Sequence, residues 1–201
     1  MVLLGVDRLD YTKGIGLRLR AFAALLESGE LEPGRHVMVQ VATPTREAVE
    51  HYQDERHEVE RLVGAINGRY SRIGLPVVHY LYQTLPFDEL IALYRAGDVM
   101  LVTPFRDGMN LVAKEFMAAQ DPENPGMVVL SSLAGAAREL TDAVIVNPHD
   151  RDEVADGIAT AISMPVEERR ERHAAMLAIL RKNDITAWRT RFVGALMQKR
   201  R

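Results

Sequence analysis

The sequence contains no cysteine in its 201 residues, which excludes disulfides, thiolate metal sites and a cysteine nucleophile. It also has no apolar run near the roughly 20 residues that a membrane-spanning helix needs. Residues 1–6 are too short for a signal peptide and lead directly into charged residues. A formal net charge of −3 gives no support for nucleic-acid or membrane binding. We therefore expect a cytoplasmic protein with neither kind of partner.

Two common nucleotide signatures are also missing. There is no Gly-x-x-x-x-Gly-Lys-Ser/Thr phosphate loop, and no Gly-x-Gly-x-x-Gly follows the first predicted strand. The six histidines are scattered, and the two that share a helix, His51 and His57, lie in a highly charged stretch where a solvated face is expected. The sequence thus predicts no metal site and excludes the usual NTPase and dehydrogenase motifs.

Apolar residues make up 47% of the chain, which is enough for one ordinary core. Short apolar strands are expected at residues 1–6, 36–42, 76–81, 98–103, 127–130 and 143–146. Helices are expected between them at residues 17–26, 46–68, 86–94 and 111–119, the second capped by the turn at residues 43–45. Three further helices follow at residues 150–164, 165–181 and 184–199. This alternation predicts an α/β fold, a doubly wound parallel sheet in a single domain with C-terminal helices from about residue 150.

Polar loops follow four of the predicted strands, at residues 7–13, 43–46, 83–86 and 106–110. In a parallel sheet these loops share one edge, and ligands bind beyond the carboxyl ends of the strands. The sequence therefore predicts a functional rim at this edge.

The stretch from Arg106 to Glu115 is the centre of that rim. A buried strand precedes it, and an amphipathic helix begins at Leu111. The free amides and the dipole of a helix N-terminus favour an anion there. Asp107 and Asn110 suit either a ligand contact or an ordinary turn and helix cap.

The first loop carries two cations, Arg8 and Lys13, followed by Gly14, which allows close backbone approach. Two cations facing a helix N-terminus suit a diphosphate. The alternative is that both are surface residues paired with Asp7 and Asp10. Glu115, one helical turn beyond Asn110, suits the diol of a ribose, or else only stabilises its helix.

Residues 6–15 (VDRLDYTKGI) and 103–115 (TPFRDGMNLVAKE) resemble motifs of the trehalose-6-phosphate synthase family. Two shorter pieces agree, at residues 134–137 (AGAA) and 144–148 (VIVNP), and the resemblance runs from residue 1 to about 192. The family consists of retaining glycosyltransferases with two Rossmann-like domains, the GT-B architecture. The resemblance implies that residues 1–201 are the C-terminal, donor-binding domain. The chain begins on a buried strand, as a natural protein or a piece of a longer one can, and the resemblance implies that the N-terminal acceptor domain is absent.

The resemblance also implies roles for individual residues. Catalytic roles fall to Arg8, Lys13 and Asp107, the two cations holding the diphosphate of a sugar nucleotide. Donor contacts are implied for Asp107, Gly108, Met109, Asn110, Leu111 and Val112. Glu115 would bind the ribose, the main chain at Leu85 the base, and Arg46 the phosphate of glucose 6-phosphate.

The implied reaction transfers glucose to glucose 6-phosphate with retained configuration and without a protein nucleophile, a metal or another cofactor. UDP-glucose is the first expectation for the donor, with GDP- or ADP-glucose open. A related pseudo-glycosyltransferase of aminocyclitol biosynthesis and a non-catalytic nucleotide-binding module are the alternatives. We expect the isolated chain to bind nucleotide weakly and to be inactive, because half of the cleft would be missing.

The last predicted helix places Trp188 and Phe192 four residues apart. In GT-B enzymes the C-terminal helix often crosses back to the other domain, and the resemblance extends that role to this helix. The alternative is that both rings pack on the core of this domain. Unmatched apolar surface on an isolated domain favours self-association, so a homo-oligomer is possible.

Overall fold

The computed structural model of the protein describes residues 1–46 and 49–198. Within them, six strands form one sheet in the order β3-β2-β1-β4-β5-β6, and all neighbouring strands are parallel. The strands are β1 (Val2–Arg8), β2 (Val37–Thr43), β3 (Val78–Leu81), β4 (Val99–Val102), β5 (Met127–Ser131) and β6 (Val144–Val146). The helices are α1 (Ile15–Ser28), α2 (Glu50–Tyr70), α3 (Phe87–Ala96), α4 (Leu111–Ala119), α5 (Arg151–Ser163), α6 (Val166–Lys182) and α7 (Ile185–Gln198), with 3₁₀ turns η1 (Tyr11–Lys13) and η2 (Gly135–Arg138). The predicted doubly wound α/β fold is confirmed.

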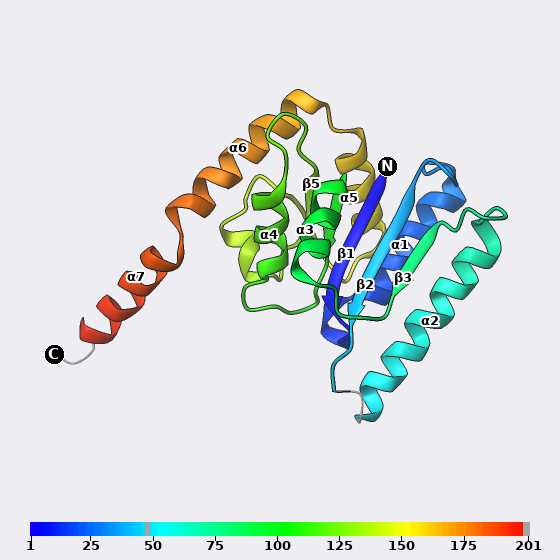
Figure 1. The fold of residues 1–201 in the computed structure, drawn as a ribbon, viewed down its shortest axis with the longest axis horizontal. Coiled ribbons are helices and arrows are strands. Elements are labelled where there is room, and N and C mark those ends of the chain that lie inside the picture. Colours follow the sequence, from blue (N-terminus) through cyan, green and yellow to red (C-terminus); the bar gives the residue numbers. More distant parts are fainter. Residues whose placement is uncertain (47–48, 199–201) are drawn as a thin grey trace.

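The helices cover both faces of the sheet. On one face α1 packs against α2 and α5, and on the other α3 packs against α4, which also contacts α6 (Figure 1). The interior strands β4 and β5 are buried along their whole length, as expected for a parallel sheet with helices on both sides. This explains why their sequences are continuous apolar runs rather than alternating patterns.

The winding of the sheet reverses between β1 and β4. From β1 the chain winds outward to β2 and β3, and from β4 it winds in the opposite direction to β5 and β6. The loops after β1 and β4 therefore leave the sheet in opposite directions at its carboxyl edge, which is the lower edge in Figure 1. In doubly wound folds this switch point is the place where ligands bind.

The predicted start of the second helix is wrong. We expected a helix from Arg46 with a cap in residues 43–45, whereas α2 begins at Glu50 after Val49, which makes no side-chain cap. Arg46 has a φ of 45°, in the left-handed region, so it cannot begin a right-handed helix. The predicted helical residues Glu47 and Ala48 lie outside the described part of the chain.

Helix α7 extends away from the body of the domain (Figure 1). The rings of Trp188 and Phe192 stack on each other with centroids 5.1 Å apart, and the two residues remain 46% and 51% exposed. The alternative that they pack on the core of this domain is therefore wrong. None of the helices in the described residues has the length and apolarity to cross a membrane.

We predict that this exposed pair promotes self-association. Apolar rings without a covering surface favour contact with a second copy of the chain. The double variant Trp188→Ser/Phe192→Ser should have a lower average mass in light scattering after gel filtration, close to the 22.5 kDa of one chain. Ile73→Ser is the control, because Ile73 is a fully exposed apolar residue elsewhere. A wild-type chain that is monomeric at the same concentration would contradict the prediction.

Candidate functional site

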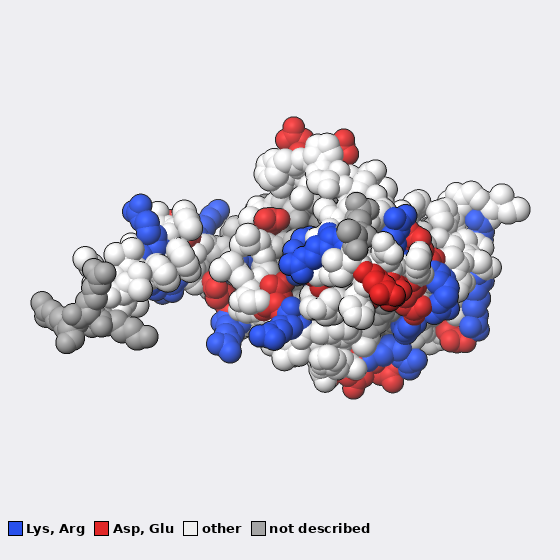
Figure 2. Space-filling view, turned by 90° about the horizontal axis from the view of Figure 1, so that it is seen from below, with Lys and Arg blue, Asp and Glu red and all other residues white. Residues whose placement is uncertain are grey.

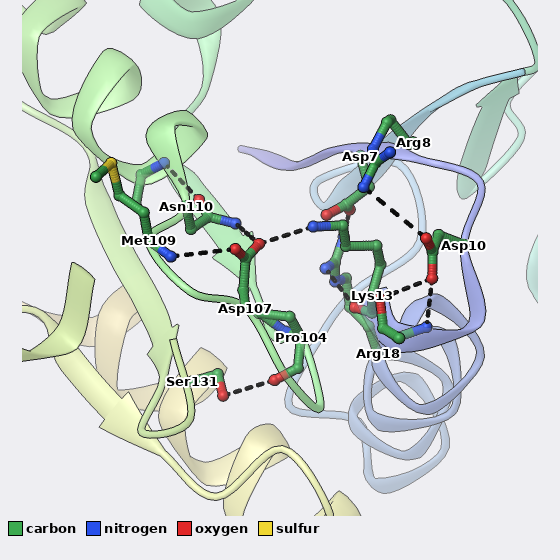
Figure 3. Close-up of polar contacts among 12 residues, drawn as sticks. Asp7, Arg8, Asp10, Lys13, Arg18, Pro104, Asp107, Met109, Asn110 and Ser131 are labelled. Atoms are coloured by element: carbon green, nitrogen blue, oxygen red, sulfur yellow. Dashed lines mark hydrogen bonds and ion pairs between the residues drawn. The ribbon is translucent and has the colours of Figure 1, made fainter. Parts of the chain in front are cut away.

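Lys13 in the loop after β1 and Asp107 in the loop after β4 contact each other. Lys13 Nζ lies 2.7 Å from Asp107 Oδ2, and both side chains are largely buried, at 12% and 17% exposure (Figure 3). The pair joins residues that are 94 positions apart in the chain. Two residues that the sequence predicted on separate loops thus form one charged centre, and Lys13 does not pair with Asp7 or Asp10.

Asp107 is held by three donors. Besides Lys13, its carboxylate accepts hydrogen bonds from Asn110 Nδ2 at 3.2 Å and from the Met109 amide at 3.3 Å. Burial raises the pKa of Asp107, but the bond and charge of Lys13 together with the two other donors outweigh burial and lower that pKa below its ordinary value. The lowered pKa keeps the Asp107 carboxylate of this centre ionised at neutral pH.

Arg8 is the exposed cation of the site. Its guanidinium is 57% exposed and lies 3.9 Å from Asp10 Oδ2. Asp10 Oδ1 accepts bonds from the Thr12 amide at 2.9 Å and the Thr12 hydroxyl at 2.7 Å, which caps η1. Burial raises the pKa of Asp10, while these bonds and the charges of Arg8 and Lys13 lower it further than burial raises it. The long Arg8 contact leaves its side chain able to reach a ligand anion.

The N-terminus of α4 faces the same centre. Asn110 adopts a φ of 73°, which Asn tolerates better than most residues, and its Oδ1 accepts a bond from the Ala113 amide at 3.0 Å. The amides of Leu111 and Val112 belong to the first turn, where no intrahelical acceptor exists. Met109 and Leu111 have exposed side chains, so this turn is open to solvent. These features satisfy the requirements of an anion-binding helix end.

The segment after β5 holds the turn of residues 107–110 in place by backbone hydrogen bonds. The amides of Gly135 and Ala136 donate to the carbonyls of Asp107 and Met109 at 3.0 Å and 2.6 Å. A Cβ atom at Gly135 would collide with the Gly108 carbonyl, so the two backbones can approach only because this position is glycine. Ser131 Oγ also donates to the Pro104 carbonyl at 2.7 Å (Figure 3). Residues 134–137 thus fix the backbone that carries Asp107 and Met109.

Glu115 lies one turn into α4 and is oriented by Tyr94 of α3. Tyr94 is fully buried, and its hydroxyl donates to Glu115 Oε2 at 3.1 Å. Burial, reinforced by the neighbouring carboxylate, raises the pKa of Tyr94 well above its ordinary value, so it stays protonated and remains a donor. Glu115 itself is exposed, which leaves its other oxygen for a ligand.

Arg46 and Leu85 lie on the same edge of the sheet but outside this centre. Arg46 Nη1 donates to Tyr52 Oη at 2.8 Å, and the Tyr52 ring contacts Tyr11 edge-on at 5.9 Å. Leu85 is half-buried in the loop between β3 and α3. Among the described residues, no hydrogen bond or ion pair joins either one to Lys13 or Asp107.

Below Lys13 lies a buried polar cluster that sequence reasoning missed. Arg18 of α1 is fully buried and pairs with Asp7 at 2.7 Å. The position of Arg18 in the sequence could have indicated its burial. It lies between Ile15 and Phe22 on the apolar face of α1, where a charged residue needs a partner.

The carboxyl edge carries mixed charge, with Lys and Arg side chains among Asp and Glu (Figure 2). No group of three or more His, Asp or Glu in residues 1–46 and 49–198 has an arrangement that could hold a metal ion. Arg8, Lys13, Asp107 and the α4 N-terminus all bring charge to the switch point. The prediction that the protein uses no metal remains a prediction.

Comparison with known proteins gives consistent results. The chain matches glycosyltransferase family 20 over residues 1–198. It is 52% identical over 197 residues to trehalose-6-phosphate synthase of Mycobacterium leprae, covering 98% of this chain and 39% of that protein. A solved E. coli structure described as bound with UDP-2-fluoro glucose is 49% identical with a TM-score of 0.95, covering 98% of this chain and 44% of the other. The structure of a Burkholderia xenovorans alpha,alpha-trehalose-phosphate synthase in complex with glucose-6-phosphate is 46% identical with a TM-score of 0.94, covering 98% and 43%.

The fold and the charged switch point together define a Rossmann-like domain of the kind found in GT-B glycosyltransferases. The chain spans about two fifths of the length of the curated relatives that it matches. It belongs to glycosyltransferase family 20.

Proposed function

We propose that this chain is the donor-binding domain of a retaining glycosyltransferase that transfers glucose from a nucleoside-diphosphate glucose to glucose 6-phosphate, giving trehalose 6-phosphate. The observation that carries the proposal is the Lys13–Asp107 centre at the N-terminus of α4. It combines a cation, an oriented carboxylate and free helical amides at the switch point of the sheet. The E. coli relative whose structure is described as bound with UDP-2-fluoro glucose supports a UDP-glucose donor, with GDP- and ADP-glucose as the competing donors.

In this proposal the phosphate groups of the donor lie between Arg8, Lys13 and the amides of Leu111 and Val112. The two cationic side chains and the two amides neutralise the charge that develops on the leaving diphosphate. Asp107, Gly108 and Met109 line the transferred sugar, Asp107 accepting bonds from its hydroxyl groups. Asn110 holds the turn by capping α4.

Glu115 accepts bonds from the ribose hydroxyls with the oxygen that Tyr94 does not occupy. The main chain at Leu85 contacts the base, and Arg46 binds the phosphate of the acceptor. The Burkholderia relative described as a complex with glucose-6-phosphate supports that acceptor. The remaining acceptor contacts belong to a second domain outside this chain, and the cytoplasm is the proposed setting.

Donor titrations and an activity assay test the proposal together. We expect calorimetry with the 201-residue chain to show weak binding of UDP-glucose and weaker binding of GDP- and ADP-glucose. With UDP-glucose and glucose 6-phosphate together, no trehalose 6-phosphate should form, because positioning of two substrates is most of what such a site provides. A full-length family member assayed beside the chain is the positive control. Absence of any nucleotide binding would contradict the donor role, and turnover at the rate of the control would contradict the need for a second domain.

A further inference from the structure

Arg18 contacts four groups beneath the site, and it is fully buried. Its Nη1 lies beside Asp7 (Figure 3) and donates to Asp7 Oδ2 at 2.7 Å and to Gln40 Oε1 at 3.0 Å. Its Nε donates to Thr103 Oγ1 at 3.0 Å, and its Nη2 lies 3.4 Å from the Lys13 carbonyl oxygen. A single guanidinium therefore contacts the loop that carries Lys13 and the strand end that leads to Asp107.

The partners of Arg18 come from separate elements. Asp7 lies near the end of β1, Gln40 in the middle of β2, and Thr103 directly after β4, so one guanidinium links three adjacent strands. Gly5 makes the cluster possible, because a Cβ atom there would collide with Arg18 Nη1 and Gln40 Oε1. The cluster thus occupies space that apolar side chains fill elsewhere in the core.

A gain in folding stability does not explain why the protein buries this charged cluster. Taking an ion pair out of water costs about as much as the pair regains, and well-packed apolar residues often replace it without loss. A planar guanidinium, however, fixes several acceptors in one geometry, which a point charge cannot do. The cluster therefore contributes geometry at the switch point more than free energy of folding.

We propose that Arg18 is a positioning residue for donor binding: it holds the Lys13 loop and the Thr103 end of β4 at the separation that places Lys13 Nζ against the donor diphosphate. The inference rests on the proposed function. Arg18 does not touch the ligand, and it acts through Lys13. Direct backbone contact supports this coupling, because the Phe105 amide donates to the Thr12 carbonyl at 2.8 Å beside the cluster.

A double-mutant cycle with Lys13 tests the inference. In NMR titrations with UDP, which measure dissociation constants into the millimolar range, Arg18→Lys should weaken binding about tenfold, because small displacements of positioned groups have large effects. In a Lys13→Ala background, Arg18→Lys should change UDP affinity by less than about twofold, because the group through which it acts is absent. Arg20→Lys, on the exposed face of the same helix, is the control and should leave affinity unchanged.

The UDP titrations distinguish the positioning role of Arg18 from the proposed donor binding. UDP affinity unchanged in Arg18→Lys, or equally reduced with and without Lys13, would overturn the inference while leaving the proposed function intact. No UDP binding by the wild-type chain would overturn both. If Arg18→Lys does not fold, Thr103→Val removes only the acceptor of Nε and should weaken UDP binding about threefold, again only when Lys13 is present. Failure of both variants to fold would assign Arg18 to folding and overturn the inference.

Discussion

Replacing Lys13 with alanine is expected to weaken UDP binding by the isolated chain about a hundredfold. Two effects of the substitution both weaken UDP binding. A charge-assisted bond to the diphosphate is lost, which is worth roughly 1.5–3 kcal/mol, where 1.4 kcal/mol is a factor of ten. The Asp107 carboxylate, which lies 2.7 Å from Lys13 Nζ, then has no counter-charge beside an incoming anion, although Asn110 and Met109 still donate to it. Calorimetric or NMR titration with UDP measures the change.

A second substitution separates these two effects. The double variant Lys13→Ala/Asp107→Asn removes the unpaired negative charge and should recover about tenfold of the lost affinity, because repulsion disappears while the missing contact does not return. Lys114→Ala is the matched control, since Lys114 also pairs with a carboxylate, Glu139, at 2.9 Å. Equal affinity of Lys13→Ala and wild type for UDP would contradict the assignment of Lys13 to the diphosphate.

Replacing Gly14 with alanine is expected to lower the free energy of unfolding by roughly 3 kcal/mol and to weaken UDP binding at least about tenfold. Gly14 has a φ of 66°, and a Cβ atom there would collide with the Thr103 carbonyl, which is backbone and cannot move aside freely. Relief of the collision must shift the loop that carries Lys13. Urea unfolding and UDP titration of the folded variant measure the two effects.

Gly29 provides a matched control for this variant. It has a φ of 82° at the end of α1, but a Cβ atom added there would meet nothing within 4 Å. Gly29→Ala should therefore show only the left-handed backbone strain, about 1 kcal/mol, with unchanged UDP affinity. If Gly14→Ala and Gly29→Ala lost equal stability and bound UDP equally, the close approach of the β1 loop to Thr103 would affect neither the free energy of unfolding nor UDP affinity.

Most of the secondary structure could be predicted from patterns of neighbouring residues. Helix α4 occupies the predicted residues 111–119, because an apolar stripe and the Asn110 cap act within a few positions of the chain. The start of α2 was wrong because the left-handed backbone of Arg46 has no signature in residue type. Arg18 was missed because its partners lie in β1, in β2 and after β4, which only a folded sheet brings together.

The sequence by itself determined the alternation of strands and helices, the polar loops that follow the strands, and the turn that begins α4, since each depends on neighbouring residues. Only the tertiary structure decided that Lys13 pairs with Asp107, that Arg18 links three adjacent strands, and that Trp188 and Phe192 lie outside the core. The physical reason is the strand order. It makes β1 and β4 neighbours although β2 and β3 separate them in sequence, so the loops that form the site meet only after the sheet has assembled.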